Sequence, residues 1–235
     1  FKKNGWKNNV LFLNHKNPRN LLAKFSSKIF KKKPNNLIGV TGTNGKSSIA
    51  NFYFQILTLN RIKAASIGTL GVNGLKVQKN FSNTTFDTIQ INKILKKLKE
   101  RRIENVILEA SSHGLNQNRL DGLEFDIGIF TNLTRDHLDY HKTFKNYFNS
   151  KLILFKKLLK KKSYAIYDND LKISSDLNKI TRLNKIKKLT LGNTKSSFVI
   201  IDHKFLKDEQ KIKFRFDKKQ YSFSTKLIGR VQIKN

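Results

Sequence analysis

Apolar residues along this chain form short continuous runs that alternate with longer segments of helical periodicity. The short runs are rich in Ile, Val, Leu and Ala, and they predict buried strands at Leu37–Thr41, Ala64–Thr69, Asn105–Glu109 and Asp126–Thr131. Helical spacing predicts helices at Lys46–Leu59, Asp87–Arg101 and Phe144–Leu159. Strands that alternate with helices in this way indicate an α/β fold, in which flanking helices cover a mostly parallel sheet.

The two ends of the chain depart from this alternation. Residues 1–36 form an irregular, basic lead-in that contains an amphipathic stretch, Leu21–Phe30, before a turn at Pro34. From Ser163 onward, short β-type runs predict a β-rich C-terminal portion, with strands at Tyr164–Tyr167, Phe198–Ile201, Ile212–Phe216 and Gln220–Phe223. The last two runs flank Asp217-Lys218-Lys219 and predict a hairpin.

Composition narrows the class of protein. The chain has 235 residues, 38% of them hydrophobic and 18 of them Phe, which is enough for a substantial core. It has no apolar run of membrane-spanning length, no signal-peptide core, and no Cys for a disulfide or a thiolate site. We therefore expect a cytoplasmic protein that does not bind a membrane. Because the chain starts at Phe1 and contains no Met, we also expect a piece of a longer protein.

The formal net charge of +32 raises the question of nucleic-acid binding. The basic residues are nearly all lysines, and they are spread along the whole chain with short clusters at Lys31–Lys33 and Lys160–Lys162. No element interleaves arginines with aromatic residues, as nucleic-acid surfaces usually do. The abundance of Lys, Asn, Ile and Phe is typical of an AT-rich coding sequence, so we expect no nucleic-acid partner.

The glycine-rich segment Gly39–Ser48 carries the main chemical signal. It joins the first predicted strand to the first predicted helix, so its backbone N–H groups and the helix dipole form a cradle for phosphate. Lys46 would reach terminal phosphates and the Ser47 hydroxyl would ligate Mg²⁺, which predicts ATP as the ligand. The segment departs from the usual P-loop spacing, because Val40 stands where that pattern has its first glycine.

Polar residues follow the third predicted strand, at the edge of the sheet where ligands gather. Glu109 ends this strand and would hold Mg²⁺ directly or through water. Gln117 and Arg119 lie two residues apart, so in extended chain they share a face and would grip an anionic substrate.

Two further segments place polar groups beside helices. Thr131–His141 follows the fourth strand, and Asp136 or His137 within it would coordinate a second cation or orient a phosphate. Asn83-Thr84-Thr85 precedes the second helix, where Thr85 or Asp87 is expected as the N-cap. The same helix N-terminus would also attract an anion.

In their order and spacing, these segments resemble the Mur ligase family, and within it the ligases that add the third amino acid of the peptidoglycan stem peptide. The matching segments are Gly39–Ser48, Asn83-Thr84-Thr85, Glu109–His113 with Gln117 and Arg119, Thr131–His141, and Ser150-Lys151 with Leu154-Phe155. The resemblance implies an ATP-dependent amide ligase. ATP would convert a carboxylate of UDP-N-acetylmuramoyl-L-Ala-D-Glu to an acyl phosphate, which the amine of diaminopimelate or lysine would attack. Lys46 and Mg²⁺ would screen the two anions that must meet.

The resemblance also implies roles for individual residues. The ATP phosphates would lie on Gly42, Thr43, Asn44, Gly45, Lys46, Ser47 and Ser48. The UDP-muramoyl dipeptide would be held by Asn83, Thr84, Thr85, Ser111, Gln117 and Arg119. Ser47 and Glu109 would hold one Mg²⁺, and His137 a second, while Lys46, His137 and Lys151 would be catalytic. Lys151 matches a lysine that becomes a carbamate in this family, a modification that would let it hold Mg²⁺ and that requires a neutral amine.

Family members have three domains, which implies how this chain is divided. Residues 1–36 would be the tail of an N-terminal UDP-binding domain with its linker, and residues 37–235 the central ATP-binding domain. The C-terminal amino-acid-binding domain would be absent, since the family's Asp-Asn-Pro-Arg motif does not occur in the chain. We therefore expect a monomer that binds ATP and has little or no ligase activity alone. Phe86, Gly114 and Gln232 stand where the family usually has Pro, Ala and Asn.

Three alternatives stay open on the residues alone. A folylpolyglutamate synthase-like ligase shares the Gly-Thr-Asn-Gly-Lys-Ser type of loop, but we would not expect it to combine Glu109–Arg119 with Asn83-Thr84-Thr85. A basic P-loop module would bind DNA or RNA in a salt-sensitive way. The third alternative is a non-catalytic remnant of a ligase.

Overall fold

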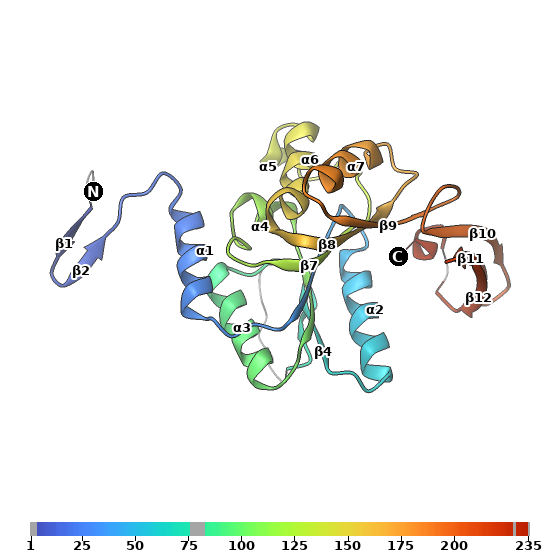
Figure 1. The fold of residues 1–235 in the computed structure, drawn as a ribbon, viewed down its shortest axis with the longest axis horizontal. Helices are drawn as coiled ribbons and strands as arrows, with labels where there is room; N and C mark the ends of the chain where they lie inside the picture. The colour runs from blue at the N-terminus through green and yellow to red at the C-terminus, as the bar shows by residue number, and fades with distance from the viewer. Residues whose placement is uncertain (1–3, 76–82, 228, 235) are drawn as a thin grey trace.

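A single ten-stranded sheet dominates the computed structural model, which describes residues 4–75, 83–227 and 229–234. The strand order is β12-β11-β10-β9-β8-β7-β3-β6-β4-β5. The strands are β3 (Asn36–Thr41), β4 (Ala64–Gly68), β5 (Gly71–Asn73), β6 (Asn105–Glu109), β7 (Phe125–Phe130), β8 (Leu159–Asp168), β9 (Lys187–Gly192), β10 (Phe198–Phe205), β11 (Gln210–Phe216) and β12 (Lys219–Thr225). Outside this sheet, β1 (Gly5–Lys7) and β2 (Val10–Phe12) form an antiparallel hairpin near the N-terminus (Figure 1).

The strands from β4 through β10 in the sheet order all pair in parallel. The four strands predicted before residue 132 are confirmed as β3, β4, β6 and β7, with ends that differ by at most one residue. In the register, Val40 pairs with Glu109 and Thr41 pairs with Phe130. The carboxyl ends of β3, β6 and β7 therefore lie side by side, and the polar loops that follow them start at one edge.

Helices cover both faces of the parallel strands. They are α1 (Pro18–Ile29), α2 (Lys46–Leu59), α3 (Thr88–Glu100), α4 (Ser112–Asn116), α5 (Leu138–His141), α6 (Phe144–Ile153) and α7 (Ser174–Leu183). Figure 1 shows α2 on one side of the central strands and α1 beside α3 on the other. Ala50 of α2 packs with Val40 and Ile107 in a small cluster, while the larger core contains Leu95 and Phe155.

The helix boundaries follow the predicted periodicity closely. α2 begins and ends at the predicted residues, and α3 differs by one residue at each end because its flanking residues are caps. Asp87 is the N-cap of α3, as expected, and its carboxylate accepts two backbone N–H bonds of 2.9 Å. The third predicted helix is wrong at its end, since α6 stops at Ile153 and a π-helical turn, Leu154–Leu158, leads into β8.

The N-terminal lead-in contains more regular structure than predicted. The expectation of an irregular segment is wrong for the β1–β2 hairpin and for α1, which includes most of the amphipathic stretch. A sequence pattern of alternating buried and exposed residues could not reveal this hairpin, because most of its apolar side chains face solvent. Trp6, for example, is 73% exposed. Asn17 caps α1 by accepting a hydrogen bond of 3.0 Å from the backbone N–H of Asn20.

The β-rich C-terminal portion is confirmed, and so is the β11–β12 hairpin around Asp217 and Lys218. These strands extend the central sheet, because β10 pairs in parallel with β9. A short 3₁₀-helix, Arg230–Ile233, follows them. Across the described residues, no helix is both long and apolar enough to span a bilayer.

Candidate functional site

The glycine-rich loop between β3 and α2 has the geometry of a phosphate cradle. Gly42 has a φ of +145°, and a Cβ there would lie 1.9 Å from the Thr131 hydroxyl oxygen, so only glycine fits. Gly45 precedes α2 in the left-handed conformation, and no side chain caps the first N–H groups of the helix. Those N–H groups remain available to an anion.

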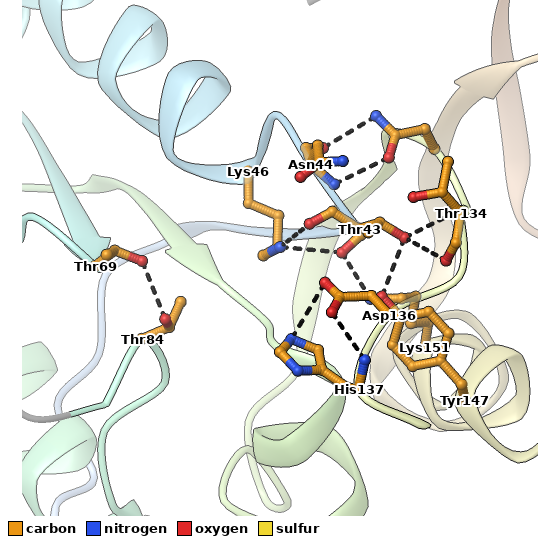
Figure 2. Close-up of polar contacts among 12 residues, drawn as sticks. Thr43, Asn44, Lys46, Thr69, Thr84, Thr134, Asp136, His137, Tyr147 and Lys151 are labelled. Atoms are coloured by element: carbon orange, nitrogen blue, oxygen red, sulfur yellow. Dashed lines mark hydrogen bonds and ion pairs between the residues drawn. The ribbon is translucent and has the colours of Figure 1, made fainter. Parts of the chain in front are cut away.

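The loop after β7 holds the glycine-rich loop in place. Asn132 accepts hydrogen bonds from the backbone N–H groups of Thr43 (3.0 Å, to its carbonyl) and Asn44 (2.9 Å, to its side chain). In return, the Thr131 hydroxyl donates to the carbonyl of Asn44 at 2.6 Å. Two of the predicted loops therefore form one rigid unit at the edge of the sheet, visible in Figure 2 around Thr43 and Asn44.

Two lysines converge on the same loop carbonyl. Lys46 Nζ donates to the carbonyls of Gly42 (3.0 Å) and Thr43 (2.7 Å), and Lys151 Nζ donates to Gly42 at 2.6 Å. Burial lowers the pKa of Lys46, although Glu109 and Asp136 act in the opposite direction. The Lys46 side chain is thus folded back on its own loop, from where it can swing to a phosphate.

Lys151 is the more perturbed of the two. Its side chain is 1% exposed, and its ammonium lies 4.3 Å from the centre of the Tyr147 ring. Burial, and then the positive charge of Lys46, lower the pKa of Lys151 to about 7, while Asp136 opposes the shift. A substantial neutral fraction of this amine therefore exists near neutral pH.

Glu109 lies at the end of β6 and is 2% exposed. Its carboxylate accepts hydrogen bonds from the Ser47 hydroxyl (2.9 Å), the Thr69 backbone N–H (2.9 Å) and the Thr69 hydroxyl (3.2 Å). These donors are neutral, and no ion pair with Glu109 occurs among the described residues. A buried carboxylate beside a hydroxyl is a suitable oxygen donor set for Mg²⁺, whose remaining ligands are usually water and substrate phosphate. The residues present therefore fit this ion.

A strip of polar side chains leads away from Glu109. The Thr85 hydroxyl donates to the carbonyl of Glu109 at 2.7 Å and accepts a bond of 2.9 Å from the backbone N–H of Ser111. Arg119 donates to the carbonyl of Thr85 at 2.5 Å and twice to the side-chain oxygen of Gln117, at 3.0 and 2.7 Å. The strip joins the segment before α3 to the segment around α4. Thr85 is thus bonded to Ser111, 26 residues later in the chain, and to Arg119, 34 residues later.

The loop after β7 ends in a strained turn that carries His137. His137 has a φ of +51°, and its imidazole Nε2 lies 3.5 Å from Asp136 Oδ2. The His113 ring packs against it edge-on, at 4.9 Å between ring centres. Nowhere in the described chain do three or more His, Cys, Asp or Glu side chains group as a metal site. A cation at His137 would therefore depend on ligands of another kind.

Most of these side chains line one cavity of about 280 Å³. Its walls are formed by Lys46, Asn83, Thr84, Thr85, Ser111, Ser112, His113, Arg119, His137 and Lys151. Glu109 and Gln117 do not line it but accept hydrogen bonds from Thr85 and Arg119, which do, and Ser47 bonds to Glu109. The cavity has three cationic side chains and no carboxylate in its walls, so it suits anionic groups.

A family model described as the Mur ligase middle domain matches residues 40–235. The chain belongs to the Mur ligase family. It is 41% identical over 211 residues to the UDP-N-acetylmuramoyl-L-alanyl-D-glutamate--2,6-diaminopimelate ligase of Rickettsia bellii (strain RML369-C), covering 88% of this chain and 44% of that protein. The chain thus spans less than half the length of the curated relatives it matches.

Solved structures agree with the family. A UDP-N-acetylmuramoyl-L-alanyl-D-glutamate--2,6-diaminopimelate ligase superimposes with a TM-score of 0.83 at 27% identity, over 94% of this chain and 46% of that one. An FPGS–AMPPCP complex superimposes with a TM-score of 0.72 at 13% identity, over 93% of this chain and 60% of that one. The second likeness shows a shared fold alone.

Several residues of this Mur ligase domain at or beside the cavity were missed as individual candidates in the sequence. Ser112 and His113 line the cavity, Tyr147 contacts Lys151, and Thr69 bonds Glu109. Their places in the sequence could have indicated them: Thr69, Ser112 and His113 closely follow the strands β4 and β6, and Tyr147 lies one helical turn before Lys151. His141 was also missed: it is 4% exposed, and burial, then the charge of His113, lower its pKa to about 4.

Proposed function

We propose that this chain is the ATP-binding part of a ligase that joins diaminopimelate to UDP-N-acetylmuramoyl-L-Ala-D-Glu, with ATP as the energy source. The observation that carries the proposal is the shared cavity. Lys46 and Lys151, which both bond to the carbonyl of Gly42, line it together with Thr85, Ser111 and Arg119. A nucleotide phosphate and a substrate carboxylate would thus meet in one positively charged cavity. The name of the Rickettsia bellii relative supports diaminopimelate as the amino acid, in preference to lysine.

For ATP, we propose that the loop Gly42–Ser48 holds the phosphates. The uncapped N–H groups at the start of α2 would bind phosphate oxygens, and Lys46 would leave the carbonyls of Gly42 and Thr43 to bind the γ-phosphate. Ser47 and Glu109 would hold Mg²⁺, and the ion would neutralise charge on the transferring phosphoryl group.

We propose that the acceptor substrate binds to this polar strip and to two further residues that line the cavity. The residues are Thr85, Ser111, Gln117 and Arg119 of the strip, with Asn83 and Thr84. Arg119 is already oriented by Gln117 and by the carbonyl of Thr85, so little rotamer freedom is lost when it meets an anion. Since the strip ends at Glu109, a carboxylate held on it would lie near the nucleotide end of the cavity.

The roles of His137 and Lys151 follow from the same geometry. We propose that Lys151 is carbamylated and that its carbamate, with His137, holds a second Mg²⁺. The amine must be neutral to react with CO₂, and the lowered pKa of about 7 favours that form. A carbamate would also remove the repulsion between Lys151 and Lys46.

The reaction then has two steps, with the charges accounted for. The substrate carboxylate oxygen attacks the γ-phosphorus, the bond to ADP breaks, and an acyl phosphate forms. The diaminopimelate amine next attacks the acyl carbon, and the tetrahedral intermediate expels inorganic phosphate, which takes up the proton that the amine nitrogen loses. Lys46 would stabilise the phosphoryl group in the first step, and the strip would keep the carbonyl aligned.

We further propose that residues 37–235 form the ATP-binding domain and that residues 1–36 link it to a UDP-binding part. We also propose that the 235-residue chain is a cytoplasmic monomer that binds its ligands but forms little product alone.

Calorimetric titration with UDP-N-acetylmuramoyl-L-Ala-D-Glu and with folate, each with Mg²⁺ and a non-hydrolysable ATP analogue present, tests the proposal. We expect the muramoyl nucleotide to bind and folate not to bind. Arg119→Gln is expected to weaken the first interaction by about 10- to 100-fold, the effect of losing a charged hydrogen bond. Binding of folate alone would favour a folylpolyglutamate synthase-like ligase, and tight, salt-sensitive binding of RNA or DNA would favour a nucleic-acid module.

A further inference from the structure

The first turn of α1 is attached to the loop that carries Arg119. Asn17 Nδ2 donates to Asn118 Oδ1 at 3.0 Å, and Asn20 Nδ2 donates to Asp121 Oδ2. Further along α1, the Ser27 hydroxyl donates to the carbonyl of Gly122 at 2.5 Å. The helix therefore contacts this loop at three places, although about 100 residues separate the two segments in the chain.

Asp121 is the centre of this attachment. It is 1% exposed, and its Oδ2 accepts hydrogen bonds from Asn118 Nδ2 (2.9 Å) and Lys157 Nζ (2.6 Å) in addition to Asn20. A buried carboxylate with this many donors fixes the groups around it, because losing any donor leaves charge without compensation. The position of α1 relative to residues 117–122 is thus determined by the fold and not by chance contact.

This attachment brings two guanidinium groups into the same region. Arg19 lies between Asn17 and Asn20 in the first turn of α1, and Arg119 lies between Asn118 and Asp121 in the loop they bond. After burial, the charge of Arg19 is the next largest cause of the lowered pKa of Arg119. Two positive charges repel each other unless an anion lies between them.

Within the described residues, neither guanidinium forms an ion pair with a carboxylate. Arg119 donates to neutral oxygens of Thr85 and Gln117, and the charge of Asp87, the N-cap of α3, offsets only part of the positive charge around it. Arg19 is exposed, and within the described ranges it forms no hydrogen bond or ion pair. The region around Arg119, which lines the cavity, therefore carries a positive charge to which Arg19 contributes.

We propose that Arg19 is a further substrate-binding residue, and that it and Arg119 together bind one anionic group of the acceptor substrate. The group is a carboxylate of the peptide or a phosphate of the nucleotide diphosphate, since both match paired guanidinium groups. Asn17, Asn20 and Asp121 are positioning residues that hold Arg19 at this place. The inference rests on the proposed function, because it requires the muramoyl nucleotide as ligand.

Calorimetric titration of the 235-residue chain with UDP-N-acetylmuramoyl-L-Ala-D-Glu tests the inference. Arg19→Gln is expected to raise the Kd about tenfold, equivalent to about 1.4 kcal/mol. Lys24→Gln is the matched control, because it removes the same charge from an exposed position on the same helix and is expected to leave the Kd unchanged. In Arg119→Gln, the further effect of Arg19→Gln is expected to be smaller than in the wild type, because the two groups share one ligand.

A second ligand distinguishes the two anions. If Arg19 contacts a peptide carboxylate, Arg19→Gln also weakens binding of N-acetylmuramoyl-L-Ala-D-Glu, which lacks the UDP group. If it contacts the diphosphate, the variant and the wild type bind this shorter ligand equally. Equal Kd values for the complete nucleotide would overturn the inference and leave the proposed function intact. If the wild type binds neither that nucleotide nor N-acetylmuramoyl-L-Ala-D-Glu, the proposed function is wrong and the inference is wrong with it.

Discussion

Two parts of the same sheet differ in what their strand ends can do. In the parallel part, the carboxyl ends of β3, β6 and β7 lie together, and the loops after them build one cavity. In the antiparallel extension, β10, β11 and β12 reverse direction at each connection, so their loops are divided between opposite edges. No residue of these three strands lines that cavity. Convergence of polar groups therefore follows from strand direction.

The two parts also differ in how they are stabilised. Val106, Ile107 and Leu108 of β6 are at most 1% exposed, with helices on both faces. In β12, Tyr221 and Phe223 are 45% and 49% exposed, and the extension depends on cross-strand ring pairs such as the stacked Phe198 and Phe216, 4.2 Å apart. Buried strands give the candidate site a rigid base, which the extension would not provide.

Substitution in the two cores is expected to give the largest contrast. Leu95→Ala removes a fully buried side chain beside the parallel strands, and we expect it to lower the free energy of unfolding by about 3 kcal/mol. Phe223→Ala in the extension is expected to cost less than about 1 kcal/mol, because the ring is half exposed. Urea denaturation measures both. If the two variants lose equal free energy of unfolding, the parallel part and the extension do not differ in how burial stabilises them.

A pH titration of stability compares a buried lysine at the site with an exposed one in the extension. The pKa of Lys151 is lowered to about 7 in the folded state, so between pH 7 and 10 the unfolded chain binds more protons at this residue. The contribution of Lys151 to the free energy of unfolding therefore rises with pH. Relative to Lys151→Met, the free energy of unfolding of the wild type is expected to increase by about 3 kcal/mol between pH 7 and 10. Lys213→Met on β11 serves as the exposed control. Parallel pH profiles for the wild type and Lys151→Met would show that the amine is not perturbed.

Nucleotide binding is expected to depend on lysines of the parallel part alone. Lys46→Met should weaken binding of Mg²⁺–ATP by about 10- to 100-fold, because a charged hydrogen bond to phosphate is lost. Lys213→Met should not change the affinity beyond a general charge effect that disappears at higher salt. Fluorescence titration with an ATP analogue measures both variants. If the two weaken binding alike, the affinity comes from net charge and not from the loop.

A smaller effect on ATP affinity is expected when the Glu109 side chain is moved by a substitution at a neighbouring residue. A Cβ at residue 68 would lie 2.1 Å from Glu109 Oε1, so Gly68→Ala must push the carboxylate away from Ser47. We expect ATP affinity in the presence of Mg²⁺ to fall about tenfold, with affinity in its absence unchanged. Gly5→Ala, where no atom lies within 4 Å of the added Cβ, is the control. An equal loss with and without Mg²⁺ would argue against Glu109 as an ion ligand.

The sequence predicted the parallel part far better than its surroundings, for physical reasons. Strands buried on both faces read as continuous apolar runs. The start of α2 was visible because it follows the glycine-rich loop, and that of α3 because it has one apolar face and the side-chain N-cap Asp87. Short elements such as α4, α5 and β5 have three to five residues and no period to detect. The β1–β2 hairpin has its apolar side chains exposed, so alternation carried no information about it.

The candidate site was predictable to a similar extent. Lys46 and Glu109 have a strong local pattern, so the sequence alone proposed them, and the structure places their charges close enough to interact. Thr69 and Tyr147 were missed because their contacts depend on packing between distant segments. The attachment of α1 to residues 117–122 was also beyond prediction, since a single asparagine or aspartate in a loop does not reveal its partner.

A crystal structure of the chain with Mg²⁺, a non-hydrolysable ATP analogue and UDP-N-acetylmuramoyl-L-Ala-D-Glu tests the central claim most directly. We expect the γ-phosphate to contact Lys46 and a glutamate carboxylate oxygen to lie about 3–3.5 Å from the γ-phosphorus, within the cavity lined by Lys151 and Arg119. A dipeptide bound outside that cavity, or a nucleotide that does not contact Gly42–Ser48, would contradict it.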